Sequence, residues 1–361
     1  MQRSLVGSEM CIRDRNNTLI NIENPAGLTG LESKRLLTEL SIFLKNESYT
    51  SGGSSNQAFT GSFSALMLGG RVIPRWYTAV SLTPYSSVGY YFQSSQPVEG
   101  NPHENYDAAF TGSGGISKVT WSNAYLLSQH WSLGMNISYL FGNIVLSEQQ
   151  SDLIVDRKMH ARSLYANLGV QYHRTLNHDL SYTLGAVYGY RQKLDITNAK
   201  YIVNGNAYEK KKQRSQKQSL PQYFGIGGCL QYKKWTYALD YAFQQYSSLT
   251  STDSRIEFRD VNECRIGVCY FPNGYSSDSF WKQVAYKTGI NISSSYMTIN
   301  GNTGFSLRFN AGLSLPVFRG RIDTSIFYDR MQLKKGTLNR DVIGATVSFT
   351  LGEIFYHSKL K

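Results

Sequence analysis

The sequence predicts an all-β protein: a transmembrane antiparallel β-barrel of about 14 strands, with a short N-terminal plug in its lumen. The first observation is the stretch from Phe305 to Leu315, in which odd positions are apolar and even positions are polar or small. Such a period of two gives a strand one apolar and one wet face. The stretch is as long as a membrane-crossing strand, which needs roughly 9–11 residues. The second observation is that the pattern recurs at 132–141, 163–172 and 235–243, broken only by Tyr165.

A large soluble antiparallel sandwich also alternates between apolar and polar residues. Strands in globular proteins usually stop at about five or six residues, however, and these are longer. The length of the strands and their regular repetition therefore favour the barrel.

The composition agrees with a barrel in a membrane. The 361 residues are 13% aromatic and include 26 tyrosines, which suits the aromatic girdles at the two membrane interfaces. The mean hydropathy of −0.34 resembles that of a soluble protein, because a barrel presents only every second residue to lipid. No apolar run approaches the roughly 18 residues of a spanning helix, so we expect no transmembrane helix.

Charge and motifs exclude several functions. The formal net charge of +12 would suit nucleic acid in a soluble protein, but in a barrel it favours anionic lipid head groups, and we expect no nucleic-acid partner. The six histidines are scattered, and no CxxC or HExxH spacing occurs. We therefore expect no enzyme, no metal site and no cofactor. Cys264 and Cys269 should face opposite sides of one strand and remain unpaired.

Along the chain, residues 1–15 lack both the alternation and the apolar core of a secretory signal. They resemble translated sequencing-adaptor read-through, so we interpret them as non-native and expect the true signal peptide to be missing. Residues 16–34 are a turn-rich hatch, and 35–361 form the barrel. The expected strands are 35–46, 57–70, 75–92, 106–114, 117–128, 131–147, 157–174, 179–196, 218–233, 235–248, 258–271, 283–299, 304–316, 319–333 and 341–356.

Of these segments, 106–114 is expected to be loop rather than wall, which leaves about 14 strands. The connections at 128–130, 233–234 and 316–320 are short, whereas 93–105, 148–156, 197–217 and 272–281 are long and polar. Short turns on one rim and long loops on the other are typical of outer-membrane barrels. We thus predict an integral protein of the Gram-negative outer membrane.

Several stretches resemble one family, the long-chain fatty acid and aromatic hydrocarbon transporters of outer membranes, in the variant widespread in Bacteroidota. The stretches that carry the resemblance are Asn24–Leu28, Arg75–Tyr77, Leu82–Tyr90, Gly112–Ile116 and Leu133–Gly142. The resemblance implies a fourteen-stranded barrel with an N-terminal hatch, whose Asn-Pro-Ala falls on Asn24, Pro25 and Ala26. It also implies diffusion of a hydrophobic molecule past the hatch towards a lateral opening in the wall.

Four sets of residues are candidates for function, each beside a purely structural alternative. Asn24, Pro25, Ala26 and Gly27 form the plug or a frayed terminus. Trp76, Tyr77, Tyr85 and Tyr90 form a platform for a hydrophobic substrate or an interface girdle. Gly112, Gly114, Gly115, Gly225, Gly227 and Gly228 kink strands to open the wall, or provide ordinary curvature. Lys210, Lys211, Lys212 and Arg214 bind phosphates of lipopolysaccharide, or lie in a solvated loop.

Two functions follow from this reading. The first is an outer-membrane channel for passive uptake of hydrophobic small molecules, such as fatty acids, through a plugged barrel. The alternative is a non-transporting scaffold or shuttle in type IX secretion or outer-membrane assembly, partnered by other outer-membrane or secretion proteins. A continuous apolar path through the wall would favour the channel. A polar, sealed lumen and an outer rim able to hold a partner would favour the scaffold.

Overall fold

The structure is a computed structural model. It describes residues 19–51, 54–98, 101–150, 153–204, 207–212, 215–249, 256–272, 279–299, 301–317, 319–333 and 339–354. The segment predicted to be non-native, 1–15, lies outside these ranges.

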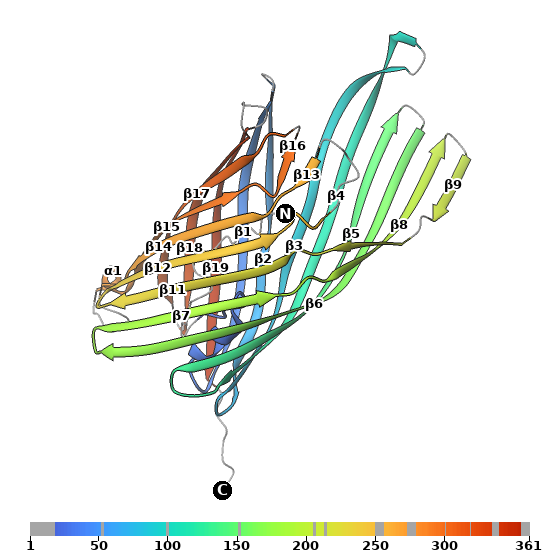
Figure 1. Ribbon diagram of the computed structural model, residues 1–361. Coiled ribbons are helices and arrows are strands. Elements are labelled where there is room, and N and C mark those ends of the chain that lie inside the picture. The colour runs from blue at the N-terminus through green and yellow to red at the C-terminus, as the bar shows by residue number, and fades with distance from the viewer. Residues whose placement is uncertain are drawn as a thin grey trace.

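A closed antiparallel barrel of 14 strands forms the body of the molecule (Figure 1). The ladder between β1 and β19 completes the closure. The barrel strands are β1 (Arg35–Ser51), β2 (Ser54–Ile73), β3 (Trp76–Val98), β4 (Asn101–Leu126), β5 (Trp131–Gln150), β6 (Leu153–Asn177), β7 (Leu180–Gly189), β11 (Gln222–Tyr232), β12 (Trp235–Gln245), β14 (Val261–Tyr270), β15 (Ala285–Ser294), β17 (Gly304–Val317), β18 (Gly320–Leu333) and β19 (Asn339–Ile354).

Smaller elements complete the fold. They are η1 (Pro25–Gly30), β8 (Lys193–Asn204), β9 (Ala207–Lys212), β10 (Gln216–Ser219), β13 (Ile256–Phe258), α1 (Phe280–Gln283) and β16 (Met297–Ile299). The strands β13 and β16 pair with each other, apart from the barrel. No helix in the described ranges is long and apolar enough to cross a membrane.

The alternation that predicted the strands is confirmed by their exposure. Phe305 and Phe309 are 54% and 47% exposed on the lipid side, whereas Ser306 and Ser314 are 4% and 5% exposed in the lumen. In β5, Leu133 to Phe141 repeat this pattern at every second position. The exception, Tyr165, lies on the luminal side, where its ring packs against a buried apolar cluster.

Above the membrane, the strands are longer than predicted. Residues 106–114 and 117–126 belong to one strand, β4, so 106–114 is strand and not loop. The expected loops 93–105 and 148–156 consist largely of strand, because β3, β4, β5 and β6 extend far beyond a membrane span. Polar residues dominate these extensions, which have no lipid to face, so the alternation that marks a wall strand fades there.

The short turns lie together on one rim as expected, but the opposite rim does not consist of long loops throughout, since only two residues each separate β1 from β2, β3 from β4 and β5 from β6. Tight turns at 74–75, 127–130, 178–179 and 233–234 lie on one rim, which we take as periplasmic. The connection at 272–281 was expected among the long outer loops. It follows β14, whose last residue, Tyr270, pairs with Trp235 and Tyr286 at this periplasmic rim.

An outer sheet stands above the barrel on one side. It consists of the distal parts of β3 (87–98), β4 (101–113), β5 (143–150) and β6 (153–162), followed by β8 and β9. The lower half of β6 pairs with β7 and its upper half with β8, because the chain breaks pairing between Tyr190 and Gln192. Figure 1 shows these strands rising away from the rest of the barrel at the upper right.

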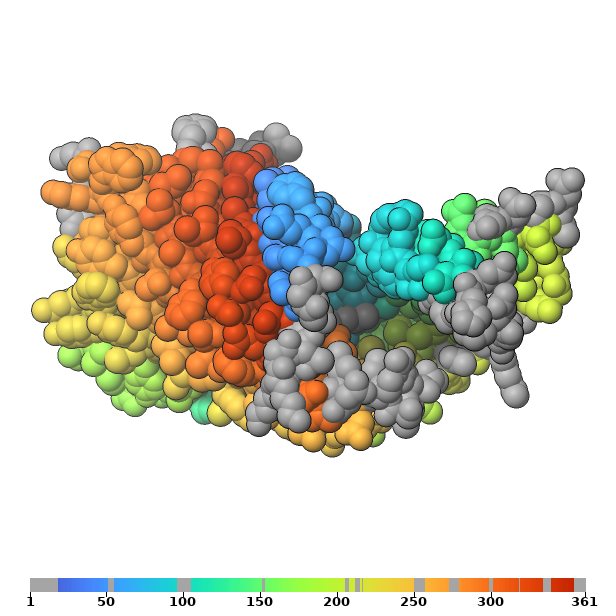
Figure 2. Space-filling model, turned by 90° about the horizontal axis from the view of Figure 1, so that it is seen from above, coloured from blue at the N-terminus to red at the C-terminus, as the bar shows by residue number. Residues whose placement is uncertain are grey.

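The wall is split between β2 and β3. The two strands pair only from Leu66 to Ile73 with Trp76 to Leu82. Above that ladder, 54–65 pairs with β1 alone and 83–98 pairs with β4 alone. We call this gap the wall split. From above, Figure 2 shows a notch between the blue strands β1 and β2 and the cyan strands β3 and β4.

Candidate functional site

The N-terminal segment, residues 19–31, is buried against the luminal faces of β3 to β6. The helix η1 starts with Pro25, whose fixed φ suits a first helical position, and Asn24 caps it by accepting from the Ala26 N–H at 3.1 Å. The Asn24 amide also donates to the Val170 carbonyl at 3.1 Å. From the wall, the Asn136 amide donates to the Ile22 carbonyl at 2.8 Å. These bonds tie the segment to β5 and β6.

Glycines on the wall make room for this segment. Gly134 of β5 and Gly169 of β6 are direct register partners. A Cβ on Gly134 would overlap the backbone of Pro25 and Ala26, and a Cβ on Gly169 would overlap the Asn24 side chain. Only glycine allows the segment to approach the wall so closely. Sequence reasoning missed both glycines, although each occupies a luminal position of an alternating strand.

Apolar side chains fill the space between the segment and β1 to β4. The cluster consists of Ile20, Ile22, Leu28, Leu31, Leu37, Ala65, Met67, Tyr77, Ala79 and Ala124. Within it, Ile20, Ile22 and Leu28 pack on the inner wall. The side-chain oxygen of Asn21 accepts from the N–H groups of Glu23 and Asn24.

The other half of the lumen carries buried ion pairs. Arg265 holds Glu263 through two bonds of 2.8 Å, and Asn291 donates to the same carboxylate at 2.6 Å. Asp323 pairs with Arg321 at 2.7 Å and with Lys287 at 3.0 Å. These groups lie on β14, β15 and β18, and all are at most 14% exposed.

A third set of ion-paired residues, centred on Asp329, lies on β17, β18 and β19. Asp329 is 1% exposed and accepts from Arg308 at 2.6 Å and from the Ser306 hydroxyl at 2.5 Å. Arg340 lies 3.5 Å from the same carboxylate. A buried charge is stable only with partners of this kind, so the luminal faces of β14 to β19 form a dense polar network.

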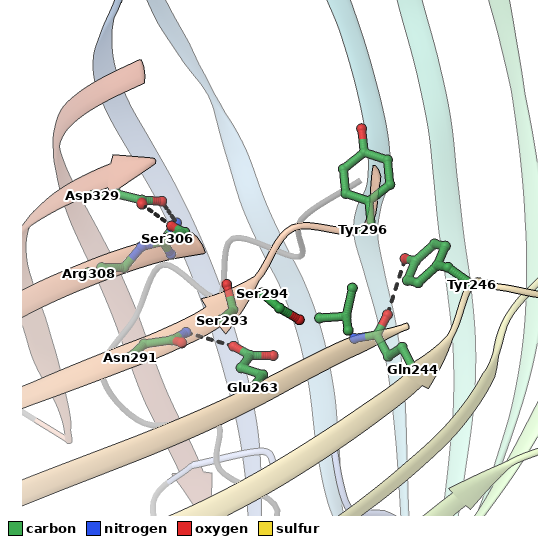
Figure 3. A pocket seen from close by; sticks show the side chains of 11 residues that line it. Gln244, Tyr246, Glu263, Asn291, Ser293, Ser294, Tyr296, Ser306, Arg308 and Asp329 are labelled. Carbon is green, nitrogen blue, oxygen red and sulfur yellow. Dashed lines mark hydrogen bonds and ion pairs between the residues drawn. The ribbon is translucent and has the colours of Figure 1, made fainter. Parts of the chain in front are cut away.

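A pocket of about 510 Å³, counting its part open to solvent, lies over this network (Figure 3). Ten of its eleven lining residues are polar or tyrosine, and only Val261 is aliphatic. In Figure 3, Glu263 and Asn291 lie on one side of it, while Tyr246 and Tyr296 come from the outer end. Tyr296 lies between β15 and β16. Burial raises the pKa of its hydroxyl, so the hydroxyl stays protonated. The pocket suits polar groups rather than an aliphatic chain.

The four aromatic residues predicted as a platform are not brought together. Trp76 is 40% exposed and faces outward at the periplasmic rim, whereas Tyr77 is buried under the N-terminal segment. Tyr85 lies at a bulge in β3, and Tyr90 lies on the outer sheet, 5.8 Å from Phe92 between ring centroids. Trp76 fits the girdle alternative instead, in line with Trp131 and Trp235 beside neighbouring short turns.

The two predicted glycine groups differ. Gly114 has a φ of 101°, and a Cβ on Gly115 would overlap the Ser86 carbonyl, so this group lies where β4 bends towards the outer sheet. Gly225, Gly227 and Gly228 keep an uninterrupted register with both β7 and β12. The break in this part of the wall comes just before them, at Leu220 and Pro221, and opposite Gln192.

Near that bend, a second apolar cluster faces the lumen. It consists of Ile116, Leu140, Ala161, Leu194 and Leu220, with Tyr85, Ile144, Tyr165 and Ile196 packed against it. It could not be predicted, because alternation within single strands does not show which luminal side chains of β4, β5, β6 and β8 meet.

Of the predicted basic residues, Lys210 and Lys211 belong to β9, the edge of the outer sheet. The Lys210 ammonium lies 5.5 Å from the centre of the Tyr201 ring, and the Lys158 ammonium lies 4.9 Å from the same centre. Lys211 pairs with Glu209 at 3.1 Å. The side chain of Lys212 and the whole of Arg214 lie outside the described residues.

In the part of the chain that the structure describes, no group of three or more His, Cys, Asp and Glu residues could hold a metal ion.

The comparisons with known proteins agree on the fold. The model of the BamG family matches residues 3–354. Similar solved structures include the Pseudomonas putida toluene transporter TodX (TM-score 0.63, 15% identity, 96% of each chain) and the CymD monoaromatic hydrocarbon channel (0.62, 14%, 98% of each chain). The Ralstonia pickettii toluene transporter TbuX gives 0.61 and 14%, over 97% of this chain and 98% of that one. No curated protein matches the sequence.

At these identities the solved structures establish the fold alone. The predicted resemblance to outer-membrane hydrocarbon and fatty acid transporters is thereby confirmed for the barrel, as is the expected barrel of about 14 strands.

Proposed function

The chain belongs to the BamG family, and from this premise we propose that it is a non-transporting scaffold barrel of the outer membrane, which holds a partner polypeptide at its outer face. Of the two functions that follow from the sequence, this one agrees better with the geometry of the lumen. Its place would be in outer-membrane assembly or secretion.

The observation that carries the proposal is the polar network of β14 to β19. A hydrophobic molecule moving along this wall would meet the charged side chains of Glu263, Arg265, Asp329 and Arg308, which are bonded to one another and offer it little apolar surface. Any of these groups that lost its partner against an apolar molecule would cost about 2–7 kcal/mol. The pocket over the network has the same polar lining.

The opposite half of the lumen supports the same proposal. There the N-terminal segment is held by hydrogen bonds from Asn24 and Asn136 and by the apolar cluster around Leu28 and Met67. A segment fixed in this way acts as a plug, and its release would require the loss of a buried core. This arrangement suits a closed scaffold better than a gate that opens often.

The outer sheet supplies a surface for a partner. It extends β3 to β6 well beyond a membrane span and adds β8 and β9. Such a length has no role in crossing the bilayer, which needs only about 9–11 residues per strand.

The cations on the outward face of this sheet suit anionic lipid head groups. Lys158 and Lys210 flank Tyr201, and Arg162 lies on the same face two rows nearer to the membrane. We assign the phosphates of outer-leaflet lipopolysaccharide to this face, which would orient the sheet on the membrane surface.

A second candidate function is passive uptake of hydrophobic small molecules, for which two observations speak. The chain shares its fold with channels named for toluene and monoaromatic hydrocarbons. The wall split also lies near Tyr85, which packs on the apolar luminal cluster around Leu140. A small apolar molecule would find a hydrophobic surface at this height of the barrel.

Purification and flux measurements separate the two functions. An affinity-tagged chain is isolated from its native outer membrane, and its partners are quantified against the barrel. The same barrel is then reconstituted alone into liposomes, and entry of toluene and of a fatty acid is measured. The scaffold predicts a stoichiometric protein partner and hydrocarbon entry no faster than in empty liposomes. A lone barrel that speeds hydrocarbon entry would contradict it and establish the channel.

A further inference from the structure

Two long sheet edges face each other across the wall split without pairing. On β2 the free edge runs from Ser54 to Ala65, and on β3 it runs from Thr83 to Val98. Each strand is paired on its other side, so its backbone is held extended. Backbone N–H and C=O groups of alternate residues on each edge therefore point into the gap and have no ladder partner.

The split is built into the strands. Where β2 leaves the ladder, Ser64 is an extra residue between the pairs Ala65–Ser41 and Phe63–Ile42. Where β3 leaves it, Tyr85 is an extra residue between the pairs Pro84–Ser117 and Ser86–Ile116. A β-bulge bends its strand, and these two lie at the same height on strands that diverge above them. Pro84 also lacks the N–H that a continued ladder would need.

Neither edge carries the charged side chains that usually protect exposed edges. No Asp, Glu, Lys or Arg occurs in 54–65 or in 83–98. Natural proteins protect free edges with charges, above all lysine, because a bare edge invites pairing with another chain. The opposite edge of the same outer sheet, β9, follows this rule with Glu209, Lys210, Lys211 and Lys212. The contrast indicates that the β9 edge faces solvent and that the edges at the split are covered.

Aromatic side chains stand on both sides of the gap. On β2, Phe59 is 74% exposed, and on β3, Tyr91 and Phe92 are 60% and 47% exposed. Phe92 stacks on Phe110 at 4.9 Å between centroids, so its position is fixed. The two faces of β3 thus offer apolar contacts to alternate side chains of a strand laid beside it.

We propose that the wall split is a strand-addition site, in which an extended, uncharged segment of a partner polypeptide pairs with the free edge of β3 and fills the gap towards β2. Backbone hydrogen bonds hold the segment, and its alternate apolar side chains pack on Tyr90 and Phe92 on one face and on Tyr91 on the other. A lipid or hydrocarbon would satisfy the aromatic rings but not the backbone groups. The inference rests on the proposed scaffold function and assigns the partner's mode of binding.

Amide hydrogen exchange tests the proposal. Exchange is measured for residues 54–65 and 83–98 in the tagged chain isolated with its native partners, and again after the complex is dissociated and the barrel is purified alone. We expect alternate amides of 87–95 to exchange at least about tenfold more slowly in the complex, and this protection to vanish in the lone barrel. Equal exchange in the two samples would overturn the proposal. Protection in the lone barrel would also overturn it, because β2 and β3 would then be covered by each other or by the chain's own N-terminal residues.

A pair of variants provides an independent test. Ser87→Lys combined with Ser95→Lys charges the β3 edge without touching the luminal side chains, and the partner recovered per barrel should fall at least about tenfold. Tyr208→Lys adds one lysine to the β9 edge and should leave recovery unchanged. A heat-modifiable band on electrophoresis shows that each barrel is folded. Equal recovery from all three chains would contradict the inference.

The two proposals fail in different ways. If no stoichiometric partner is found, the scaffold function fails. If a partner is present at full stoichiometry while 83–98 exchanges freely, the scaffold stands and the strand-addition site is wrong. If the protection depends on a second copy of this chain, seen as a change in oligomeric state, the partner class is wrong.

Discussion

Gly134 and Gly169 face each other across β5 and β6, and residues 24–26 occupy the space that side chains at these two positions would fill. The wall and the N-terminal segment therefore fit each other in shape as well as through hydrogen bonds. Because the overlap is with backbone and with the asparagine that caps η1, neither partner can move aside easily.

Gly134→Leu or Gly169→Leu should therefore dislodge the N-terminal segment. Overpacking of this kind typically costs about 1–3 kcal/mol, and proteolysis within 19–31 should accelerate about tenfold or more. Limited proteolysis of the barrel in detergent, followed by mass spectrometry, measures this. Gly228→Leu is the control, because a Cβ there meets only Leu184, at 3.4 Å on the lipid side. Unchanged cleavage in both luminal variants would mean that the fit is not tight.

Charge on the lipid face should destabilise the barrel more than the same charge in the lumen. Phe309 is 47% exposed near the middle of β17, and the next residue, Asn310, faces inward. Phe309→Arg should cost about 2–4 kcal/mol, as arginine does at the bilayer midplane, whereas Asn310→Arg should cost clearly less. Chemical unfolding of the barrel in lipid vesicles gives both values. Equal losses would contradict the assignment of faces.

Alternation was enough to predict most of the wall, because lipid on one side and water on the other impose a period of two on each strand. Tyr165 shows where this logic ends. An aromatic residue on the luminal face breaks the pattern, and its packing against the apolar cluster that contains Leu140 and Leu194 explains it. In the same way, the strands above the membrane have no lipid face, so 93–98 and 101–105 resembled loops.

The wall split could not be predicted, because alternation does not say which neighbours pair or how far. Two signals were nonetheless present in the sequence. One is Pro84 within an otherwise regular strand, and the other is the absence of charge from 54–65 and 83–98. Each becomes informative only once these segments are known to be edges.

The pair of Arg265 and Glu263 offers a test of the luminal network. Both side chains are buried, at 14% and 11% exposure, and are joined by two bonds. Arg265→Met leaves the carboxylate unpaired and should cost about 3–5 kcal/mol. Adding Glu263→Gln removes the stranded charge and keeps an acceptor for Asn291, so the double variant should be more stable than the single one. A double-mutant cycle in guanidinium measures the coupling, and a double variant less stable than Arg265→Met would contradict it.

The two cysteines of β14, which form no disulfide, report the two faces of the wall. Cys264 pairs in register with Ile292 on the lipid side, and Cys269 pairs with Lys287 on the luminal side. In a Cys229→Ser background, a charged maleimide should label Cys269 at least about tenfold faster than Cys264, because lipid excludes the charged reagent. Labelling sites are read by mass spectrometry. A disulfide between Cys264 and Cys269 would contradict the strand, whose pleat keeps them apart.

Deletion of residues 16–30 tests whether the N-terminal segment closes the lumen. The deletion removes Ile20, Ile22 and Leu28 from the apolar cluster, and it frees the Asn136 amide and the Val170 carbonyl that now bond the segment. The remaining wall still has every strand of the barrel, so a folded, water-filled lumen is expected. Entry of small polar solutes into liposomes should rise several-fold, whereas hydrocarbon entry should stay at the level of empty liposomes, because the network from Glu263 to Asp329 keeps the lumen polar. If hydrocarbon entry rises instead, the segment is the gate of a channel. If neither rises in a barrel shown to be folded, the segment does not close the lumen.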